Sequence, residues 1–219
     1  ELPRDDCKKI QIEMLDTLAD FCEKNGLRYY LSGGTLLGAI RHKGFIPWDD
    51  DIDVNMPRPD CEKLLQVTKG KLGRFYFCNP DMNGFAPNCG FFRIYDFSTV
   101  VENYYGNSTS HPVYHPLFVD VFPIEGLPES DIATKLHYTN IVILRKLQRV
   151  ASLKHMDAKS PVAHVFHILA MPLAKLVGYQ NWSKAIQKCA KKYAFDDCKY
   201  IGVMTAPVHA TNEKVKKAD

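Results

Sequence analysis

The sequence predicts an α+β protein in which a mixed β-sheet flanked by helices fills the first half of the chain and helices fill the second half. Two features of the 219 residues support this expectation. Short apolar stretches of strand length recur up to about Pro128, and longer segments with apolar residues at every third or fourth position follow it. We therefore expect a core at residues 1–128 and a helical region at residues 129–219, packed together as one domain.

Individual elements follow from the same periodicities. Helical spacing predicts helices at residues 5–24, 35–41, 59–69, 131–153, 162–177 and 182–193. Apolar runs predict strands at residues 27–31, 52–56, 74–78, 90–95, 99–102 and 117–122, and the Asn, Ser, His and Pro content of residues 106–116 predicts a surface loop. The apolar stretch at 162–178 is short and contains His, Pro and Lys, so we expect a buried helix rather than a membrane span.

Composition excludes several classes of protein. Hydrophobic residues make up 46% of the chain and charged residues 24%, as in globular domains and unlike disordered chains. A formal net charge of +3 gives no electrostatic case for nucleic acid, so we expect none as a partner. The seven cysteines are odd in number and include no Cys-x-x-Cys pair, which favours free thiols in a reducing compartment over a zinc site. Because no apolar leader follows the charged start, we expect a cytoplasmic protein, with peripheral contact at the inner face of the membrane left open.

Aspartates crowd residues 49–53, within an otherwise apolar segment. Asp51 and Asp53 alternate with Ile52 and Val54, so they share one face of a strand and lie roughly 6.6 Å apart. Two carboxylates at that spacing repel each other and require a compensating cation. Oxygen ligands favour Mg²⁺ or Mn²⁺ over zinc or copper, so we predict Asp51 and Asp53 as catalytic metal ligands. An acidic loop exposed to water is the competing interpretation.

A glycine turn comes shortly before the acidic segment. Glycines let a phosphate approach the backbone, and the start of a helix donates N–H groups to an anion. A phosphate cradle beside a metal site supplies what phosphoryl transfer needs. The predicted substrate contacts are Ser32, Gly33, Gly34 and Thr35 at the phosphates, and the cations Arg41, His42 and Lys43 around them. A plain turn and a solvated basic surface are the alternatives.

Two lone charges interrupt later strands. Asp120 is the one charge within residues 117–122, and a charge in an apolar strand is costly unless it is paired. We predict Asp120 as the third metal ligand or as the base for an attacking hydroxyl, against the alternative of a solvent-facing edge position. Arg93 could hold a donor phosphate, or it could pair with Asp96 or another carboxylate.

Taken together, these segments resemble the LicD family, which also includes the catalytic domains of fukutin and fukutin-related protein. The resemblance covers roughly residues 5–128. It rests on Gln11-Ile-Glu-Met-Leu15 in the first helix, on Gly34-Thr-Leu-Leu-Gly38, on the long segment Arg41-His-Lys-Gly-Phe-Ile-Pro-Trp-Asp-Asp-Asp-Ile-Asp53, on Arg93 with Thr99, and on Phe118-Val-Asp-Val-Phe-Pro123.

The resemblance implies a nucleotidyltransferase-like catalytic core and a Mg²⁺-dependent phosphotransferase. Its reaction would move phosphocholine or a polyol phosphate from a CDP-linked donor to a sugar hydroxyl, releasing CMP, as in lipopolysaccharide or teichoic acid biosynthesis. Asp51, Asp53 and Asp120 would be the metal ligands, and the Ser32–Thr35 turn would line the donor phosphates. Family members usually continue into an aromatic, proline-rich segment that is not found before Asp219, so we expect the helical region to be incomplete.

Three other functions remain as alternatives. A metal-dependent glycosyltransferase also holds a nucleotide diphosphate with an Asp-x-Asp motif, but such folds build several strands before the motif, where one is expected here. A nucleotidyltransferase would add a whole nucleotide and release pyrophosphate. A non-enzymatic nucleotide-binding protein ranks below these, because all three candidate carboxylates are present.

Overall fold

The computed structural model describes residues 4–80, 90–103, 113–152, 171–205 and 214–217. The chain divides into two compact units, one made of residues 1–79 and 91–123 and the other of residues 80–90 and 124–219. Strand β6 (Val113–Leu127) contributes to both units, with the boundary after Pro123. The single-domain organisation with a division near residue 128 stays a prediction.

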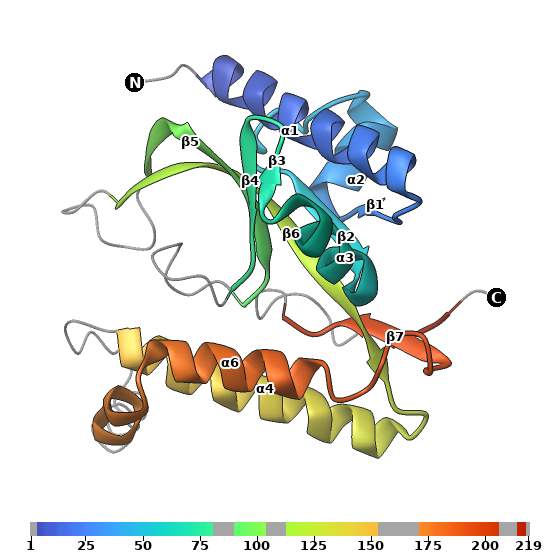
Figure 1. Cartoon of the computed structure of the whole chain (residues 1–219), viewed down its shortest axis with the longest axis vertical. Helices are drawn as coiled ribbons and strands as arrows, with labels where there is room; N and C mark the ends of the chain where they lie inside the picture. The colour runs from blue at the N-terminus through green and yellow to red at the C-terminus, as the bar shows by residue number, and fades with distance from the viewer. Residues whose placement is uncertain (1–3, 81–89, 104–112, 153–170, 206–213, 218–219) are drawn as a thin grey trace. The chain divides into compact units, whose positions relative to one another are not determined.

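The first unit contains most of the β-sheet (Figure 1). Its elements are α1 (Arg4–Asn25), β1 (Tyr30–Leu31), α2 (Gly33–His42), β2 (Asp53–Pro57), α3 (Arg58–Thr68), β3 (Lys71–Leu72), β4 (Phe75–Cys78), β5 (Phe92–Asn103) and the first part of β6. The strands lie in the order β1-β2-β6-β5-β4-β3, so β6 is central and adjoins both β2 and β5. The predicted α+β class with a mixed sheet is confirmed.

Helix α1 follows directly from its sequence. Met14, Leu18 and Cys22 recur at every fourth position and are at most 1% exposed, so one stripe of the helix faces the core of this unit. The helix ends at Asn25 because Gly26 adopts a φ of 61°, a left-handed conformation that favours glycine. Buried residues of β2, such as Val54 and Met56, belong to the same core. The core therefore supports β2, which begins at Asp53, while Asp51 lies in the segment just before the strand.

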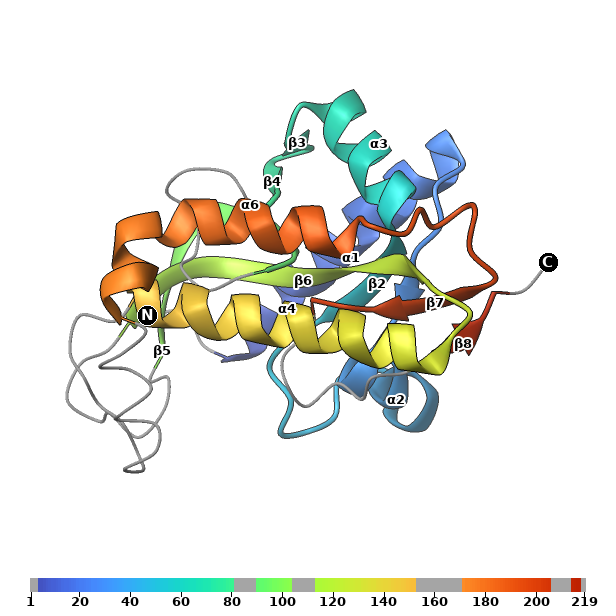
Figure 2. The same ribbon diagram turned by 90° about the horizontal axis from the view of Figure 1, so that it is seen from below.

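The second unit pairs two helices with a small extension of the sheet. Its elements are the last residues of β6, α4 (Asp131–Ser152), helical residues 171–177, α6 (Tyr179–Ala190), β7 (Tyr200–Val203) and β8 (Val215–Lys216). Helices α4 and α6 run antiparallel and side by side in both views (Figures 1 and 2). Their contact buries Tyr138 and Ile141 of α4 with Ile186 of α6.

Several predicted boundaries need correction. The strands expected at 90–95 and 99–102 are one strand, β5, whose ladder with β6 is irregular between Asp96 and Val101. The loop predicted at 106–116 is wrong at Val113–Pro116, because pairing with the end of β5 supplies strand hydrogen bonds there, and its residues 106–112 lie outside the described residues. The predicted helix at 162–177 is described only from residue 171, where it is helical. The short strands β3, β7 and β8 were not expected, because stretches this short carry no readable periodicity.

Two expectations about the chain as a whole can be compared with the described residues. Within them, no helix is both long and apolar enough to cross a membrane. The six cysteines in this part of the chain are free thiols.

Candidate active site

Asp53 opens β2 directly beside the glycine turn. Its backbone N–H donates to the Thr35 hydroxyl oxygen at 2.8 Å, and its carbonyl oxygen accepts from the Ser32 N–H at 3.0 Å. Helix α2 begins at Gly33, so the turn, the helix start and the strand start are fixed to one another. The glycine turn and the acidic segment, which α2 and a loop separate in the sequence, therefore lie next to each other in the fold.

The two glycines of the turn lie against carboxylates. Gly33 has a φ of 51°, and a Cβ added there would lie 3.4 Å from Asp53 Oδ2. A Cβ added at Gly34 would lie 2.3 Å from Asp49 Oδ2, which is closer than atoms can approach. Any larger residue at position 34 would displace the Asp49 side chain. Glycine at this position thus leaves room for the Asp49 carboxylate, and it also suits the close approach of a phosphate.

Asp120 joins the site from the central strand. Its N–H donates to the Ile52 carbonyl at 3.0 Å, which brings Asp120 of β6 beside the start of β2. On the other side of β6, Asp120 is the register partner of Arg93 in β5. The Arg93 guanidinium contacts both carboxylate oxygens, Nε at 2.5 Å and Nη2 at 3.4 Å. It also lies over the Phe118 ring, 3.9 Å from the centroid. Of the two predicted options for Arg93, the structure thus shows pairing with a carboxylate.

The electrostatics of the site come from crowding of like charges. Burial raises the pKa of Asp53 from 3.8 to about 7, and the charges of Asp51, Asp120 and Asp49 add to this rise against the opposing effect of Arg93. Burial, followed by the influence of Asp49, raises the pKa of Asp51 to about 6. Burial also raises the pKa of Asp120, and Arg93 opposes that rise. These carboxylates lie close enough to disfavour each other's ionisation, which is the condition under which a cation binds.

The donor set fits a hard divalent cation. Carboxylate oxygens of Asp49, Asp50 and Asp51 all lie within 4.8 Å of one another. Such oxygen-only ligands suit Mg²⁺ or Mn²⁺. Of this group only Asp51 belongs to the predicted ligand set, while Asp53 and Asp120 interact with it electrostatically. Asp51 thus belongs both to this group and to the predicted ligand set of Asp51, Asp53 and Asp120, and metal binding by that predicted set stays a prediction.

The predicted cations lie at the other end of α2. Arg41 and His42 are exposed in its last turn, and Lys43 caps it with a φ of 56°. At 1.5 Å per residue, the ten residues of α2 separate them from the glycine turn by roughly 13 Å along the helix. Lys43 returns toward the acidic segment, because it lines a pocket together with Asp49. Phosphate binding by Arg41 and His42 stays a prediction.

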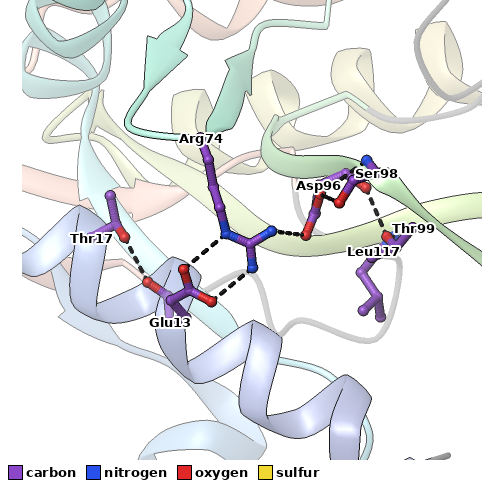
Figure 3. A network of polar contacts seen from close by, with 7 residues as sticks. All are labelled: Glu13, Thr17, Arg74, Asp96, Ser98, Thr99 and Leu117. Atoms are coloured by element: carbon purple, nitrogen blue, oxygen red, sulfur yellow. Dashed lines mark hydrogen bonds and ion pairs between the residues drawn. The ribbon is translucent and has the colours of Figure 1, made fainter. Parts of the chain in front are cut away.

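A network of polar contacts holds β5, and with it Arg93, in register (Figure 3). The Asp96 carboxylate, 2% exposed, accepts from Arg74 Nη1 at 2.8 Å and from the Ser98 N–H at 3.0 Å. Arg74 also binds Glu13 of α1 through Nε and Nη2, at 2.8 and 2.7 Å. The Thr99 hydroxyl donates to the Asp96 carbonyl at 2.7 Å and accepts from the Leu117 N–H at 2.9 Å, which bridges the irregular part of the β5–β6 ladder.

Sequence reasoning did not assign a role to Gln11. This side chain is 3% exposed and lies on the buried stripe of α1. Its amide nitrogen donates to the carbonyl of Asp50 at 3.1 Å and to the carbonyl of Phe118 at 3.3 Å. Gln11 therefore ties the acidic segment to β6 near Asp120. The sequence signal that could have identified Gln11 is a polar residue on the apolar face of an amphipathic helix, one turn before Met14.

Comparison with known proteins agrees with this geometry. Residues 26–176 match the family model described as LicD/FKTN/FKRP, nucleotidyltransferase domain. The chain belongs to the LicD family. The matched segment includes the glycine turn, the acidic segment, Arg93 and Asp120, and Gln11 lies before it.

Relatives of this LicD-family chain include transferases of phosphate-containing groups. It is 30% identical over 195 residues to the lipopolysaccharide cholinephosphotransferase LicD of Haemophilus influenzae, which covers 88% of this chain and 70% of that protein. It is 45% identical over 53 residues to the ribitol 5-phosphate transferase FKRP of Homo sapiens, covering 23% of this chain and 11% of that protein. An uncharacterized protein of Rickettsia prowazekii is 38% identical over 55 residues, 25% of this chain and 21% of that protein. These relatives support an enzymatic, phosphoryl-substituent transferase role.

Proposed function

We propose that the protein transfers phosphocholine or a polyol phosphate from a CDP-linked donor to a sugar hydroxyl of a cell-surface glycan or glycolipid precursor, releasing CMP. The observation that supports this proposal is that the backbone of Asp53 is hydrogen-bonded to the Ser32–Thr35 turn, and that the charges of Asp51 and Asp120 act on the Asp53 carboxylate. Membership of the LicD family, and relatives named for cholinephosphate and ribitol 5-phosphate transfer, support the same reaction class.

In the proposed reaction the acceptor oxygen forms a bond to the phosphorus that carries the substituent. The bond between that phosphorus and the bridging oxygen breaks, and this oxygen leaves with its electron pair on CMP. The hydroxyl proton passes to solvent water, and Asp120, whose carboxylate Arg93 holds in position, would serve as a ligand of the ion. A bound Mg²⁺ or Mn²⁺ would neutralise the phosphate oxygens and polarise the breaking bond.

The residues of the chain have separate tasks in this proposal. Asp51, Asp53 and Asp120 would hold the divalent ion, with Asp49 and Asp50 as the alternative partners of Asp51. The N–H groups at the start of α2 receive the donor phosphates, and Lys43 adds a positive charge on the pocket side.

Product analysis tests the reaction. The protein is incubated with CDP-choline or CDP-ribitol, a glycan acceptor and Mg²⁺, and the released nucleotide is identified by chromatography. We expect CMP, and we expect Asp53→Asn and Asp120→Asn to abolish its release. A released nucleoside diphosphate would support the glycosyltransferase alternative, and pyrophosphate release from CTP would support a nucleotidyltransferase.

Metal titration separates the two carboxylate arrangements. If Asp51, Asp53 and Asp120 are the ligands, Asp53→Asn weakens Mn²⁺ binding more than Asp50→Asn does. The reverse order would assign the ion to Asp49, Asp50 and Asp51. Calorimetry with Mn²⁺ on both variants and the wild type measures this directly.

We also propose that the protein works in the cytoplasm in peripheral contact with the inner face of the membrane, because the proposed acceptors are built on lipids there. Sedimentation with lipid vesicles tests this location. Recovery of all protein in the supernatant, at every anionic lipid content, would contradict it.

A further inference from the structure

Gln11 bridges the acidic segment and β6 next to a direct hydrogen bond between their backbones. In that direct bond, the Asp120 N–H donates to the Ile52 carbonyl at 3.0 Å. Two residues earlier on each segment, the Gln11 amide nitrogen lies within reach of both backbones. It donates to the carbonyl oxygens of Asp50 and Phe118, at 3.1 and 3.3 Å. The Gln11 side chain thus continues the link between the two segments past the direct bond.

These hydrogen bonds fix the backbone on both sides of Asp51. The Asp50 carbonyl belongs to the peptide bond that joins Asp50 to Asp51, and Gln11 holds it. The Ile52 carbonyl follows Asp51 in the chain, and Asp120 holds it. Peptide bonds are planar and rigid, so two fixed carbonyls leave the Asp51 backbone little freedom relative to β6. Gln11 therefore helps to set where Asp51 lies relative to Asp120.

The direction of the Gln11 amide follows from its partners. Its nitrogen faces two carbonyl oxygens, which can only accept hydrogen bonds. The reverse direction would place the side-chain oxygen against both carbonyls. In the observed direction Oε1 is buried, and no donor among the described residues reaches it. The amide thus makes two hydrogen bonds through its nitrogen and none through its oxygen.

The unpaired oxygen indicates what the amide is needed for. A buried acceptor without a donor lowers the stability of the fold. Gln11 is 3% exposed and lies one turn before Met14 on the buried stripe of α1. A methionine at position 11 would have similar length and would bury no unpaired oxygen. What the amide supplies, and a methionine lacks, is the pair of N–H donors to the acidic segment and β6.

We propose that Gln11 is a positioning residue of the candidate active site, which holds Asp51 in the place relative to Asp120 that divalent-cation binding requires. The proposal rests on the proposed metal-dependent function. Gln11 does not contact the ion and acts through the backbone of the acidic segment. The same role applies if the ion is held by Asp49, Asp50 and Asp51, because Gln11 fixes the peptide bond between the last two.

Calorimetric titration with Mn²⁺, combined with thermal unfolding of the metal-free protein, tests the proposal. Gln11→Met keeps the length of the side chain and removes both donors. We expect it to weaken Mn²⁺ binding about tenfold, as is usual when a group that orients metal ligands is lost. We expect the melting temperature to change by less than about 4 °C, because the variant frees two carbonyls but also removes the unpaired oxygen.

Two further variants separate positioning from general destabilisation. Leu18→Val is the matched control, because Leu18 is buried on the same stripe of α1 and belongs to the same core. It should lower the melting temperature through lost packing and keep the Mn²⁺ affinity within about twofold of wild type. Gln11→Leu also lacks the donors and should weaken Mn²⁺ binding as Gln11→Met does.

The outcomes distinguish the role of Gln11 from the proposed function. Equal Mn²⁺ affinities of the wild type and Gln11→Met, with CMP release by the wild type intact, would overturn the role of Gln11 and leave the function standing. Mn²⁺ affinities that follow the melting temperatures across all three variants would show a general structural effect and would also overturn it. Failure of the wild type both to bind Mn²⁺ and to release CMP would refute the proposed function, and the role of Gln11 with it.

Discussion

Two carboxylates of the first unit, Asp96 and Asp53, have opposite surroundings. Asp96 is 2% exposed and receives an arginine, a backbone N–H and a serine hydroxyl (Figure 3). Asp53 lies among other carboxylates, and with its burial they raise its pKa to about 7. A carboxylate supplied with donors stabilises the fold. A buried carboxylate among other carboxylates lowers the stability of the fold. We infer that a bound cation compensates for this loss of stability in the active protein.

The largest expected effect comes from neutralising the crowded carboxylate. Asp53→Asn should lower the transfer rate by a factor of about 10³ or more, because it removes charge that positions the ion and the phosphates. The same change should raise the melting temperature of the metal-free protein at pH 8, because it relieves repulsion. Steady-state kinetics and thermal unfolding measure the two effects. A variant that loses activity and also stability would contradict the comparison.

Neutralising Asp96, the carboxylate that has hydrogen-bond donors, should lower the stability of the fold and leave ligand binding nearly unchanged. Asp96→Asn leaves Arg74 without its buried partner and should destabilise the fold by about 2–3 kcal/mol, after allowance for the half-exposed arginine. Urea unfolding at pH 7 gives this value. CMP binding at temperatures well below unfolding should stay within about twofold of wild type. An unchanged urea midpoint of unfolding would show that the contacts of Asp96 do not stabilise the irregular part of the β5–β6 ladder.

The pH dependence of stability sharpens the contrast. Asp51 and Asp53 have folded-state pKa values raised to about 6 and 7, from 3.8, so between about pH 4 and 7 the folded protein binds more protons than the unfolded chain. Stability from these groups is therefore present at low pH and is lost as the pH rises through 6 to 7. For Asp53 we expect a loss of about 2 kcal/mol after discounting for solvent screening. Unfolding of wild type and Asp53→Asn from pH 5 to 8 should show a flatter dependence in the variant.

The smallest effect is expected at the exposed end of the Arg74 network. Glu13 pairs with Arg74 at the surface, and its side chain is half exposed, so Glu13→Gln should change the melting temperature by less than about 2 °C. Adding 0.5 M salt to the wild type should have an effect of similar size. A shift as large as that of Asp96→Asn would mean that Glu13, rather than the buried partner, anchors the arginine.

Local pattern was enough to predict some parts of this molecule. The helical spacing of Met14, Leu18 and Cys22 predicted α1, and the apolar run at 52–56 predicted β2, which begins at Asp53 so that Asp51 precedes the strand. Both are properties of a few consecutive turns or residues, which periodicity reports directly. The family resemblance, confirmed over residues 26–176, rests on such local motifs.

Contacts between distant segments could not be predicted in the same way. The pairing of Arg93 with Asp120 depends on the register of β5 and β6, and sequence alone left it as one of two options. Gln11 contacts a carbonyl 107 residues away, and no local pattern encodes that contact. The strand at Val113–Pro116 has loop-like composition and forms because β5 offers a partner. Tertiary pairing overrode local preference there.

The register of β5 against β6 limits how this protein can vary in length. One residue inserted between Leu117 and Asp120 would turn the Asp120 side chain to the opposite face of the sheet and away from Arg93. An insertion before Val113 leaves that alignment untouched. Homologues and engineered variants should therefore differ in size before β6 and keep constant spacing from Leu117 to Asp120.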